Sequence, residues 1–226
     1  MLGTVLAEEA QRLERAVSLA EQERERQVQA RLVELGALTA TVAHDVRNPL
    51  NVIGMAVAMG DPEVRTEVGD QVRRIARLAD DLLDYAKPWS MAATRMDLAE
   101  LARRLAARHH VEARVPQDLR VLADAERVEQ ALGNLIENAR AAASRVVLEV
   151  DCRDGLARPH VCDDGPGIPA DLRGRVFEPF VSRSPGGTGL GLAIVARIAA
   201  ASGGGIALTE RAGWTTCFTL SLPQAS

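Results

Sequence analysis

The stretch Ala43-His44-Asp45-Val46-Arg47-Asn48-Pro49-Leu50 places an imidazole beside a carboxylate, with an amide one helical turn further on. Around it, seam positions recur at alternating spacings of three and four residues, as at the a and d positions of a helix bundle. These positions are Leu32, Leu35, Thr39, Val42, Val46, Pro49, Ile53 and Ala56. His44 lies two residues after the d position Val42, at the f position farthest from the seam. We therefore expect His44 to face solvent rather than fill a core.

A solvent-facing histidine beside a carboxylate has a chemical use. The Asp45 carboxylate can accept the proton of one ring nitrogen, which fixes the tautomer and leaves the other nitrogen a better nucleophile. Asn48 follows His44 by four residues, so the two share a helix face and the amide could hold a water near a group attached to the ring. The alternative is that all three are ordinary surface residues of a bundle helix. The rest of the chain has to decide between these interpretations.

The composition of the 226 residues narrows the class of protein. Hydrophobic residues make up 47% and aromatic residues only 3%, which predicts a core of Ala, Leu and Val, as in helix bundles. The 27 basic and 31 acidic residues are interspersed, which gives no basic field for nucleic acid. No apolar run reaches the roughly 18 to 20 residues of a membrane span, and no signal-peptide pattern is present. We expect a soluble cytoplasmic protein, or a fragment of a longer sensor, that binds no nucleic acid.

The cysteines give no framework for a metal or for several disulfides. Cys152, Cys162 and Cys217 are odd in number and have no metal-ligand spacing. In a reducing cytosol such residues are expected to be small core side chains, and that is the interpretation we adopt.

The first third of the chain has the pattern of long helices. Residues 7–33 contain neither Pro nor Gly and carry an imperfect heptad, which predicts a charged lead-in helix or coiled coil; a solvated linker helix is the alternative. Gly60-Asp61-Pro62-Glu63 interrupts the helical pattern. A second apolar stripe then follows at Val64, Val68, Val72, Ile75, Ala79, Leu82 and Ala86. A helical hairpin buries such a stripe most simply against a second copy, so we predict a homodimeric four-helix bundle over about residues 30–87.

After a linker at residues 88–94 the periodicity changes and predicts a mixed α/β domain without internal repeats. Helices are expected from Asp97, from an N-cap at Asp124 to about Ala143, and over about residues 188–201. Strands are expected at residues 111–115, 145–150, 157–162, 205–209 and 215–222. Asp154-Gly155 is the predicted turn between the second and third of these strands.

Three separated pieces of this second domain together predict a phosphate-binding site. Asp163-Asp164-Gly165-Pro166-Gly167 follows a predicted strand, and Gly186-Gly187-Thr188-Gly189-Leu190-Gly191-Leu192 begins a predicted helix. Glycines let backbone N–H groups approach an anion, and a helix N-terminus adds a favourable dipole. On the preceding helix Asn134, Glu137 and Asn138 share a face, where their oxygens suit a hard cation such as Mg²⁺. Each piece alone is weak, since Asn138 could merely cap a turn and the Walker lysine is missing.

In this order the motifs resemble those of the sensor histidine kinases of two-component signalling. Residues 43–50 look like the family's H box and Asn134-Leu135-Ile136-Glu137-Asn138-Ala139 like its N box. Residues 163–167 look like the G1 box, Phe177-Glu178-Pro179-Phe180 like the F box and residues 187–192 like the G2 box. The resemblance covers about residues 30–222. It implies a helical hairpin forming a dimeric four-helix bundle, followed by an α/β sandwich of the Bergerat (GHKL) type that binds ATP.

The resemblance also implies a division of the chain. Residues 1–30 would be a coiled-coil or signalling lead-in and residues 31–87 the dimerisation and histidine-phosphotransfer domain. Residues 88–95 would be a linker and residues 96–226 the catalytic ATP-binding domain. Partners implied are a second copy of the chain and a response-regulator receiver domain, whose aspartate accepts the phosphoryl group.

Particular residues receive roles from the same resemblance. His44 would accept phosphate from ATP, Asp45 would orient and activate it, and Asn48 would position water in a phosphatase reaction toward the phosphorylated regulator. Asp163 would read the adenine amino group and Asn138 would hold Mg²⁺. Asn134 stands where related ATPases have a glutamate base, which fits transfer to His44 instead of water. The remaining nucleotide-binding residues implied are Gly165, Gly167, Gly187, Thr188, Gly189, Leu190 and Gly191.

Departures from the family pattern concern a few positions. Asp45 stands where Glu is commoner, a conservative change. In the short lid at residues 181–185, Arg183 and Ser184 replace a Thr-Lys pair, and Arg183 could still meet phosphate. Arg140 is the basic residue expected shortly after the N box. Three histidines match no motif and are interpreted as incidental: His109, His110 and His160.

Two other functions remain to be weighed against a kinase. A simple ATPase of the same superfamily would hydrolyse ATP without forming a phosphoprotein, and Asn134 in place of the base argues against it. A non-catalytic scaffold would bind a receiver domain through the bundle, and the set formed by Asn138, Asp163 and the glycine-rich stretch argues against that.

Overall fold

The structure, a computed structural model, describes residues 18–19, 21–22, 25–26, 30, 46, 48–53, 64–86, 92–182 and 187–225. By its internal contacts the chain divides into two compact units, Met1–Trp89 and Ser90–Ser226. The described residues between 18 and 53 are all helical, as the sequence predicts. The interruption predicted at residues 60–63 lies outside the described residues.

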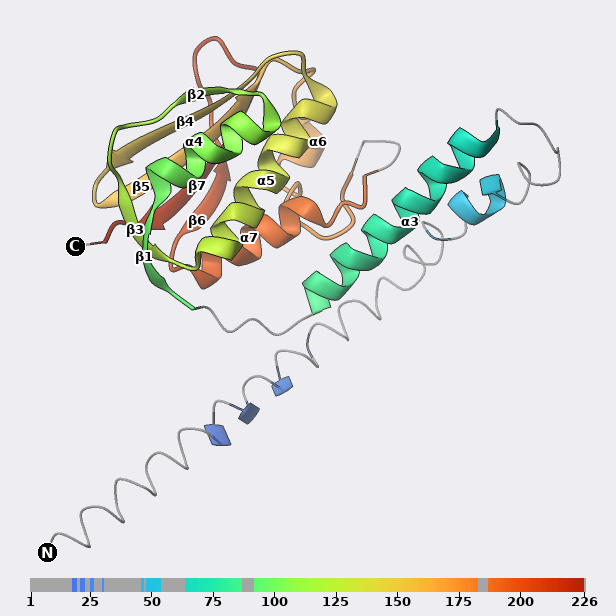
Figure 1. The fold of residues 1–226 in the computed structure, drawn as a ribbon, viewed down its shortest axis with the longest axis horizontal. Coiled ribbons are helices and arrows are strands. Elements are labelled where there is room, and N and C mark those ends of the chain that lie inside the picture. Colours follow the sequence, from blue (N-terminus) through green and yellow to red (C-terminus); the bar gives the residue numbers. More distant parts are fainter. Residues whose placement is uncertain are drawn as a thin grey trace, which may run out of the picture. The chain divides into compact units, whose positions relative to one another are not determined.

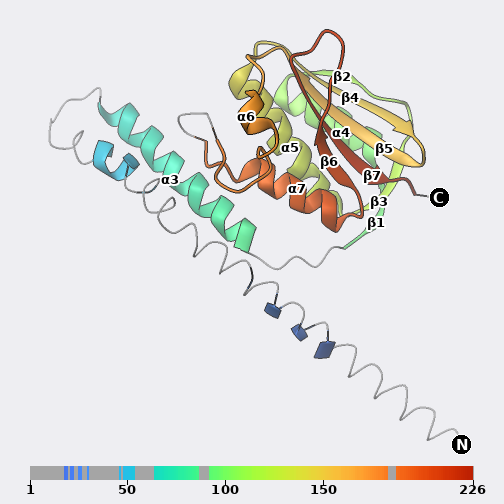
Figure 2. The same ribbon diagram turned by 180° about the vertical axis from the view of Figure 1, so that it is seen from behind.

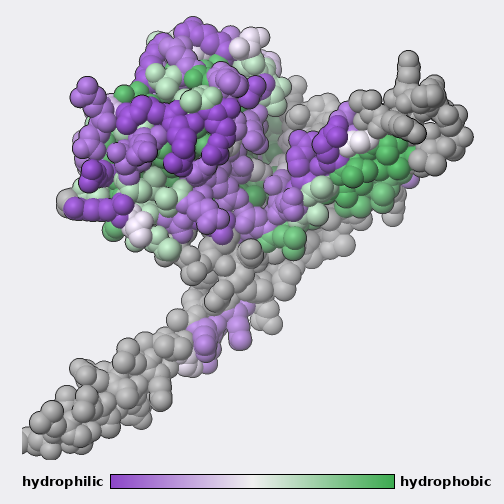
Figure 3. Space-filling view, viewed as in Figure 1, coloured by the Kyte–Doolittle hydropathy of each residue, from purple (hydrophilic) through white to green (hydrophobic). Residues whose placement is uncertain are grey.

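In the first unit the long helix is α3 (Val64–Ala86). Its surface is amphipathic, and Figure 3 shows hydrophobic side chains along the face in view. Val72, a member of the predicted stripe, is 52% exposed. Leu83, which follows the stripe residue Leu82, is 67% exposed. Leu78 and Tyr85, which the predicted stripe left out, are buried. The helix therefore carries apolar surface on more than one side.

The second unit is a two-layer α/β sandwich (Figures 1 and 2). Its five-stranded sheet has the order β2-β4-β5-β7-β6. The strands are β2 (Glu112–Arg114), β4 (Val146–Arg153), β5 (Leu156–Asp163), β6 (Gly205–Leu208) and β7 (Thr216–Pro223). Neighbours are antiparallel except β2, which is parallel to β4. One face of the sheet is covered by α4 (Leu98–His109), α5 (Ala125–Ala142) and α7 (Gly191–Ala201).

Helix starts and turns in this unit follow from local sequence chemistry. The Asp97 carboxylate accepts the Glu100 N–H at 2.8 Å and so caps α4. Asp124 caps α5 by accepting the N–H groups of Glu126 and Arg127 at 3.1 and 3.2 Å. In the β4–β5 turn Asp154 and Gly155 both have positive φ, of 54° and 74°, as a tight hairpin turn requires. These three predictions are confirmed.

The core lies between the sheet and the three helices. Because successive side chains of a strand point to opposite faces, alternate residues of β4 enter this core and the others reach the outer face. The largest fully buried side chains are Leu98, Leu105, Leu132, Leu135, Ile136, Leu148, Leu190, Ile194, Ile198, Phe218, Leu220 and Leu222. The predicted aliphatic core is therefore confirmed, with Phe218 as its largest member.

The structure also differs from the prediction in its short elements. Thr94–Asp97 forms β1, which pairs antiparallel with β3 (Arg120–Ala123), and neither strand was predicted. The short helix α6 (Ala170–Arg173) was missed as well. Helix α7 begins at Gly191, three residues later than expected, so most of the glycine-rich stretch is loop. Four residues contain few turns or alternations, so elements of this length are easily missed by periodicity, although β6, also four residues long, was predicted.

Candidate nucleotide-binding site

Asp163 ends β5 with its carboxylate buried on the helix-covered face of the sheet. It is 3% exposed, and its Oδ1 accepts the N–H of Gly165 at 3.0 Å. Burial raises the pKa of the Asp163 carboxyl, against hydrogen bonds from the Gly165 N–H and the Thr216 hydroxyl, which favour the charged form. A carboxylate has about four acceptor positions, so two donors leave capacity for a ligand amino group. The Asp163 carboxylate is therefore placed to accept a hydrogen bond from a ligand.

The neighbouring Asp164 has a different task. Its Oδ1 accepts the backbone N–H groups of Ser144 and Arg145 at 3.1 and 2.8 Å, and its own N–H donates to the Arg145 carbonyl. Asp164 therefore fastens the loop after β5 to the connection between α5 and β4. Local chemistry does not distinguish the two adjacent aspartates, and only the family resemblance had assigned the ligand role to Asp163.

The glycines after Asp163 are required by close backbone approaches. A Cβ on Gly165 would lie 2.8 Å from Asp163 Oδ1 and 2.9 Å from the Ala142 carbonyl oxygen. Gly167 has φ of 78°, in the left-handed region that favours glycine. The loop can therefore pass directly beside the end of α5.

The glycine-rich stretch before α7 is packed against the segment that ends at Phe180. Gly189 has φ of 69°, and a Cβ there would lie 2.5 Å from the Phe180 carbonyl carbon. The Phe180 N–H donates to the Gly189 carbonyl at 2.9 Å. Leu190 is fully buried and anchors the stretch, while Gly187 is exposed and Thr188 is half-buried. Backbone groups at the start of α7 are thereby held in place at the surface.

Helix α5 joins these loops along a single stripe. Asn134 is half-buried, and its Nδ2 donates to the Gly191 carbonyl at 3.3 Å, at the start of α7. Asn138 follows one turn later and is exposed, and Ala142 contacts the loop at Gly165 another turn on. Eight residues of helix rise by about 12 Å. An elongated ligand lying along this stripe would meet the α7 start at one end and Asp163 at the other.

The donors present fit Mg²⁺ held partly by a ligand. No group of three or more His, Cys, Asp or Glu side chains that could hold a metal occurs among the described residues. Mg²⁺ commonly takes one or two protein oxygens and completes its shell with substrate phosphates and water. The exposed amide of Asn138, midway along the stripe, is such a donor. Glu137 is also exposed, on the adjoining position of the helix.

Other predicted site residues fall outside this constellation. His44, Asp45 and Arg183 lie outside the described residues, and Asn48 is exposed on a helical segment of the first unit. Arg140 does not join the stripe: it lines a hollow of about 410 Å³ that is also lined by Arg145 and Glu112. Two residues apart on a helix, Asn138 and Arg140 point to different sides, which explains the separation.

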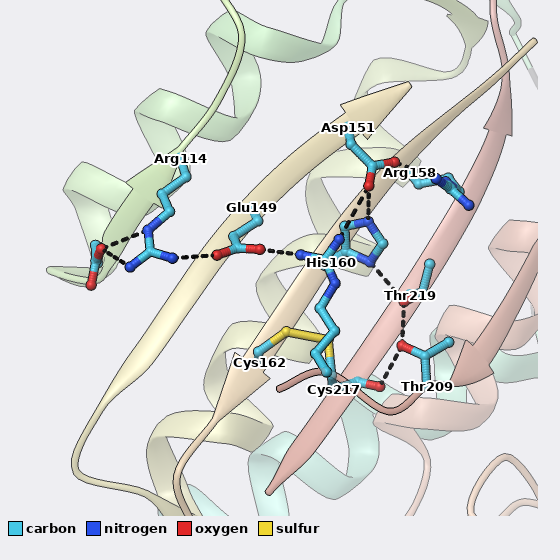
Figure 4. A network of polar contacts seen from close by, with 11 residues as sticks. Arg114, Glu149, Asp151, Arg158, His160, Cys162, Thr209, Cys217 and Thr219 are labelled. Atoms are coloured by element: carbon cyan, nitrogen blue, oxygen red, sulfur yellow. Dashed lines mark hydrogen bonds and ion pairs between the residues drawn. A yellow bond between two sulfur atoms is a disulfide. The ribbon is translucent and has the colours of Figure 1, made fainter. Parts of the chain in front are cut away.

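The cysteine prediction is confirmed for the burial of Cys162 and Cys217, but it is wrong for Cys152 and it missed the pairing. Cys162 and Cys217 stand directly opposite each other on β5 and β7 and form a disulfide (Figure 4). Cys152 is an exposed free thiol. Residues 55 apart in sequence come together because the strand register aligns them, and no local signal announces that register.

His160 is a structural residue of the outer face of the sheet and not an incidental one. It is 4% exposed, with Nδ1 2.8 Å from the Thr219 hydroxyl and Nε2 3.0 Å from an Asp151 oxygen (Figure 4). Burial lowers the pKa of His160, and the nearby Arg211 lowers it further, while Asp151 acts in the opposite direction. The neutral imidazole is therefore the form this face accommodates.

Charged side chains cross the same outer face in a chain of ion pairs. Arg114 bridges Glu112 and Glu149, each at 2.7 Å. Arg211 joins Glu149 to Asp151, and Arg158 pairs with Asp151 at 2.8 Å. Figure 4 shows these ion pairs together with the hydrogen bonds that continue the network from His160 through Thr219 to Thr209. Each of these acids has a cationic partner.

Comparisons with known proteins agree with this architecture. The model of the His Kinase A (phospho-acceptor) domain matches residues 34–88, and that of the histidine kinase-, DNA gyrase B- and HSP90-like ATPase matches residues 123–226. The sensory histidine kinase/phosphatase NtrB of Rhodobacter capsulatus is 34% identical over 216 residues, which cover 81% of this chain and 61% of NtrB. The sensor histidine kinase ZraS of Escherichia coli is 33% identical over 218 residues, covering 85% of this chain and 46% of ZraS.

Solved structures give the same likeness. The histidine kinase ThkA in complex with the response regulator protein TrrA has a TM-score of 0.76 at 28% identity, covering 91% of this chain and 66% of that chain. Full-length ShkA in complex with AMPPNP has a TM-score of 0.57 at 30% identity, covering 83% and 45%. The chain thus spans 61% of NtrB and about half of ZraS. In the part of the chain that the structure describes, no helix is both long and apolar enough to span a bilayer.

Proposed function

The chain belongs to the sensor histidine kinases of two-component signalling, and from that premise we propose that it phosphorylates its own His44 with ATP. The phosphoryl group then passes to an aspartate of a response-regulator receiver domain. The observation that carries the proposal is the stripe of α5 that links Asp163 to the start of α7 through Asn134 and Asn138. A kinase also needs a residue that accepts the phosphoryl group. The match to the phospho-acceptor domain at residues 34–88 contains His44, which we assign to this role.

Nucleotide binding would use both ends of the stripe. The buried Asp163 carboxylate accepts the adenine amino group, because its remaining acceptor capacity points to the helix-covered face where α5 passes. The triphosphate lies toward residues 187–191, where glycines expose backbone N–H groups and α7 begins. Mg²⁺ bound between Asn138 and the phosphates would neutralise charge that builds up during phosphoryl transfer.

Asn134 favours a kinase over an ATPase. A carboxamide cannot take a proton from water, and here its Nδ2 already donates to the Gly191 carbonyl. The side chain thus ties α5 to α7 and leaves the attacking role to another group. We assign that role to His44, with Asp45 holding the imidazole in its nucleophilic tautomer.

A phosphatase activity toward the phosphorylated regulator is part of the proposal. Asn48 is exposed on its helix, one turn beyond His44 in sequence, where its amide can orient a water. The relative NtrB carries the name kinase/phosphatase, which supports looking for both activities here.

We further propose a homodimeric chain that works in the cytoplasm, where ATP and receiver domains are available. The exposed apolar residues Val72 and Leu83 on α3 support burial against a second copy. For the division of the chain we keep a lead-in at residues 1–30, a phosphotransfer domain at 31–87 and a linker that follows it. We extend the catalytic domain from residue 96 to Thr94, because β1 starts there and pairs with β3.

The direct test is incubation with γ-labelled ATP and Mg²⁺, comparing the parent with His44→Gln. We expect acid-labile, base-stable label on the parent and none on the variant. Steady ATP hydrolysis without labelled protein would support a simple ATPase, and nucleotide binding without label or hydrolysis would support a scaffold. Label that persists on His44→Gln contradicts the assignment of the acceptor.

A further inference from the structure

The disulfide joins β5 to β7 one step before the proposed adenine reader. Cys162 pairs with Cys217 in the antiparallel register, and the next pair along the strands is Asp163 with Thr216. Because side chains alternate between faces, the sulfurs lie on the outer face while Asp163 and Thr216 lie on the helix-covered face. The bond therefore fixes the two strands at the position that sets the spacing of Asp163 and Thr216.

The sulfurs are also covered by Trp214, which is connected through Arg145 to the loop that follows Asp163. Cys162 and Cys217 are 0% and 1% exposed and form a small apolar cluster with Val147, against which Trp214 packs. The Arg145 guanidinium lies 4.8 Å from the centre of the Trp214 ring. The Arg145 backbone N–H donates to Asp164, in the loop that follows Asp163. A change in the cluster thus has two routes to that loop.

Resting on the proposed cytoplasmic kinase function, we propose that Cys162 and Cys217 form a reversible dithiol–disulfide site whose state sets the nucleotide affinity of the neighbouring site. In reducing compartments a disulfide is usually transient or redox-sensing, which is why a buried pair beside a ligand site points to regulation. The partner chemistry is a small disulfide such as oxidised glutathione.

Oxidised glutathione is the only other reactant that the thiol–disulfide exchange needs. One cysteine thiolate attacks oxidised glutathione, which forms a mixed disulfide and releases one glutathione thiolate. The second cysteine thiolate then attacks the protein sulfur of the mixed disulfide and releases the other. Two electrons pass from the cysteine pair to the glutathione disulfide, and the two protons of the cysteines end on the released thiols.

Reduction must alter the packing of the cluster. A covalent bond holds two sulfurs closer than van der Waals contact allows, so two thiols in the same place need additional room. Protein interiors are close-packed, and the atoms next to the sulfurs include the strands that carry Asp163 and Thr216. We expect the reduced form to bind nucleotide at least about fivefold more weakly, the lower end of typical couplings between sites.

Trp214 packs against the buried cysteines, so we expect a thiol reagent to reach the sulfurs where the loop that carries Trp214 opens. Arg211 of this loop pairs with Glu149 and Asp151 on the outer face, and these ion pairs hold the loop against the sheet. Local opening of such a loop would admit a thiol reagent without global unfolding. Arg211→Ala should therefore speed reduction by dithiothreitol several-fold while leaving the affinity of each redox form unchanged.

The test uses the full chain carrying Cys152→Ser, which removes the exposed thiol. The protein is equilibrated in glutathione buffers of increasing reducing strength, its thiols are counted after denaturation, and the Kd of a non-hydrolysable ATP analogue is measured in each buffer. We expect Kd to rise with the thiol count and to return on reoxidation. Adding Cys217→Ser should fix Kd at the reduced value in every buffer.

Each other outcome overturns the inference in a recognisable way. Equal Kd values for the oxidised and reduced forms would remove the regulatory role while leaving the kinase proposal intact. A disulfide that never forms in the folded chain, or that is reduced only when the chain unfolds, would make the site either absent or purely structural. Loss of nucleotide binding in both forms would instead defeat the proposed function itself.

Discussion

The two faces of the sheet in the second unit use acidic side chains in opposite ways. On the outer face, burial alone would raise the pKa of Asp151, but hydrogen bonds from Arg158 and His160 outweigh it and hold that pKa below its usual value. On the helix-covered face, burial raises the pKa of Asp163. Among the residues that the structure describes, no cationic side chain pairs with Asp163. An acid whose acceptors are taken by arginines stabilises the fold, whereas one with acceptors to spare can recognise a ligand.

The two faces also differ in what holds them in shape. The outer face is held by side chains, through ion pairs that span Arg114 to Arg158. The ligand side is shaped by backbone, with Gly165 and Gly189 at positions where a Cβ would lie under 3 Å from other atoms. Substitutions on the two sides should therefore change different properties.

The largest expected effect is on nucleotide affinity, when one acid of each face is replaced and the two variants are compared. Asp163→Asn should weaken binding of a non-hydrolysable ATP analogue by about 3 kcal/mol, or roughly 150-fold, because a charged acceptor is replaced and a ligand donor loses its partner. Asp151→Asn should leave affinity unchanged and lower the free energy of unfolding. Isothermal titration calorimetry with both variants checks this. Equal losses of affinity would erase the distinction between the faces.

A smaller effect is expected on stability from glycines beside the site. Gly189→Ala should lower the free energy of unfolding by about 2–3 kcal/mol, since it adds a left-handed penalty to a clash with Phe180. A Cβ added at Gly133 in α5 would meet no atom within 4 Å beyond its chain neighbours and the backbone of its own helix, so Gly133→Ala should raise the free energy of unfolding by about 0.5–1 kcal/mol. Urea unfolding of the two variants tests the opposite signs. A Gly189→Ala chain as stable as the parent would show that the loop yields.

Much of this contrast could be predicted from the sequence because it is local. The Asp124 cap, the Asp154-Gly155 turn and the glycine-rich start of α7 are short signals whose chemistry needs no tertiary context. The ligand roles of Asn138 and Asp163 were predicted differently, from the resemblance of their motifs to those of a known family.

What the sequence could not predict depends on strand register and packing. Asp163 and Asp164 are chemically identical neighbours, so local chemistry could not tell them apart; the family resemblance pointed to Asp163, and the end of β5 is what buries it while Asp164 stays exposed. The pairing of Cys162 with Cys217 likewise needs the β5–β7 register. His160 matched no motif because its partners, Asp151 and Thr219, come from two other strands.

The smallest expected effect is a pH dependence from the outer face. The folded-state pKa of His160 lies below the value of about 6.5 for an unfolded chain. On acidification the unfolded chain therefore takes up this proton first, and stability falls as pH drops through about 6.5 until the folded-state pKa is reached. The contribution of His160 to stability is complete above that unfolded-state value. Urea unfolding at pH values from about one unit above to about one unit below 6.5 should show this slope.

His160→Gln should flatten that slope, while His110→Asn, at an exposed position with positive φ, should leave it unchanged. The same pH range should barely alter nucleotide affinity, because Asp163 lies on the other face. A slope that survives His160→Gln would assign it to other groups.

The most direct measurement is to follow the backbone amides of the chain by NMR while the non-hydrolysable ATP analogue and Mg²⁺ are added. The account predicts shifts at residues 163–167, at Asn138 and at residues 187–191, with Glu149 and His160 on the outer face unaffected. Shifts centred instead on the hollow of about 580 Å³ lined by Leu122 and Pro223 would contradict it, because none of the proposed ligand residues lies there.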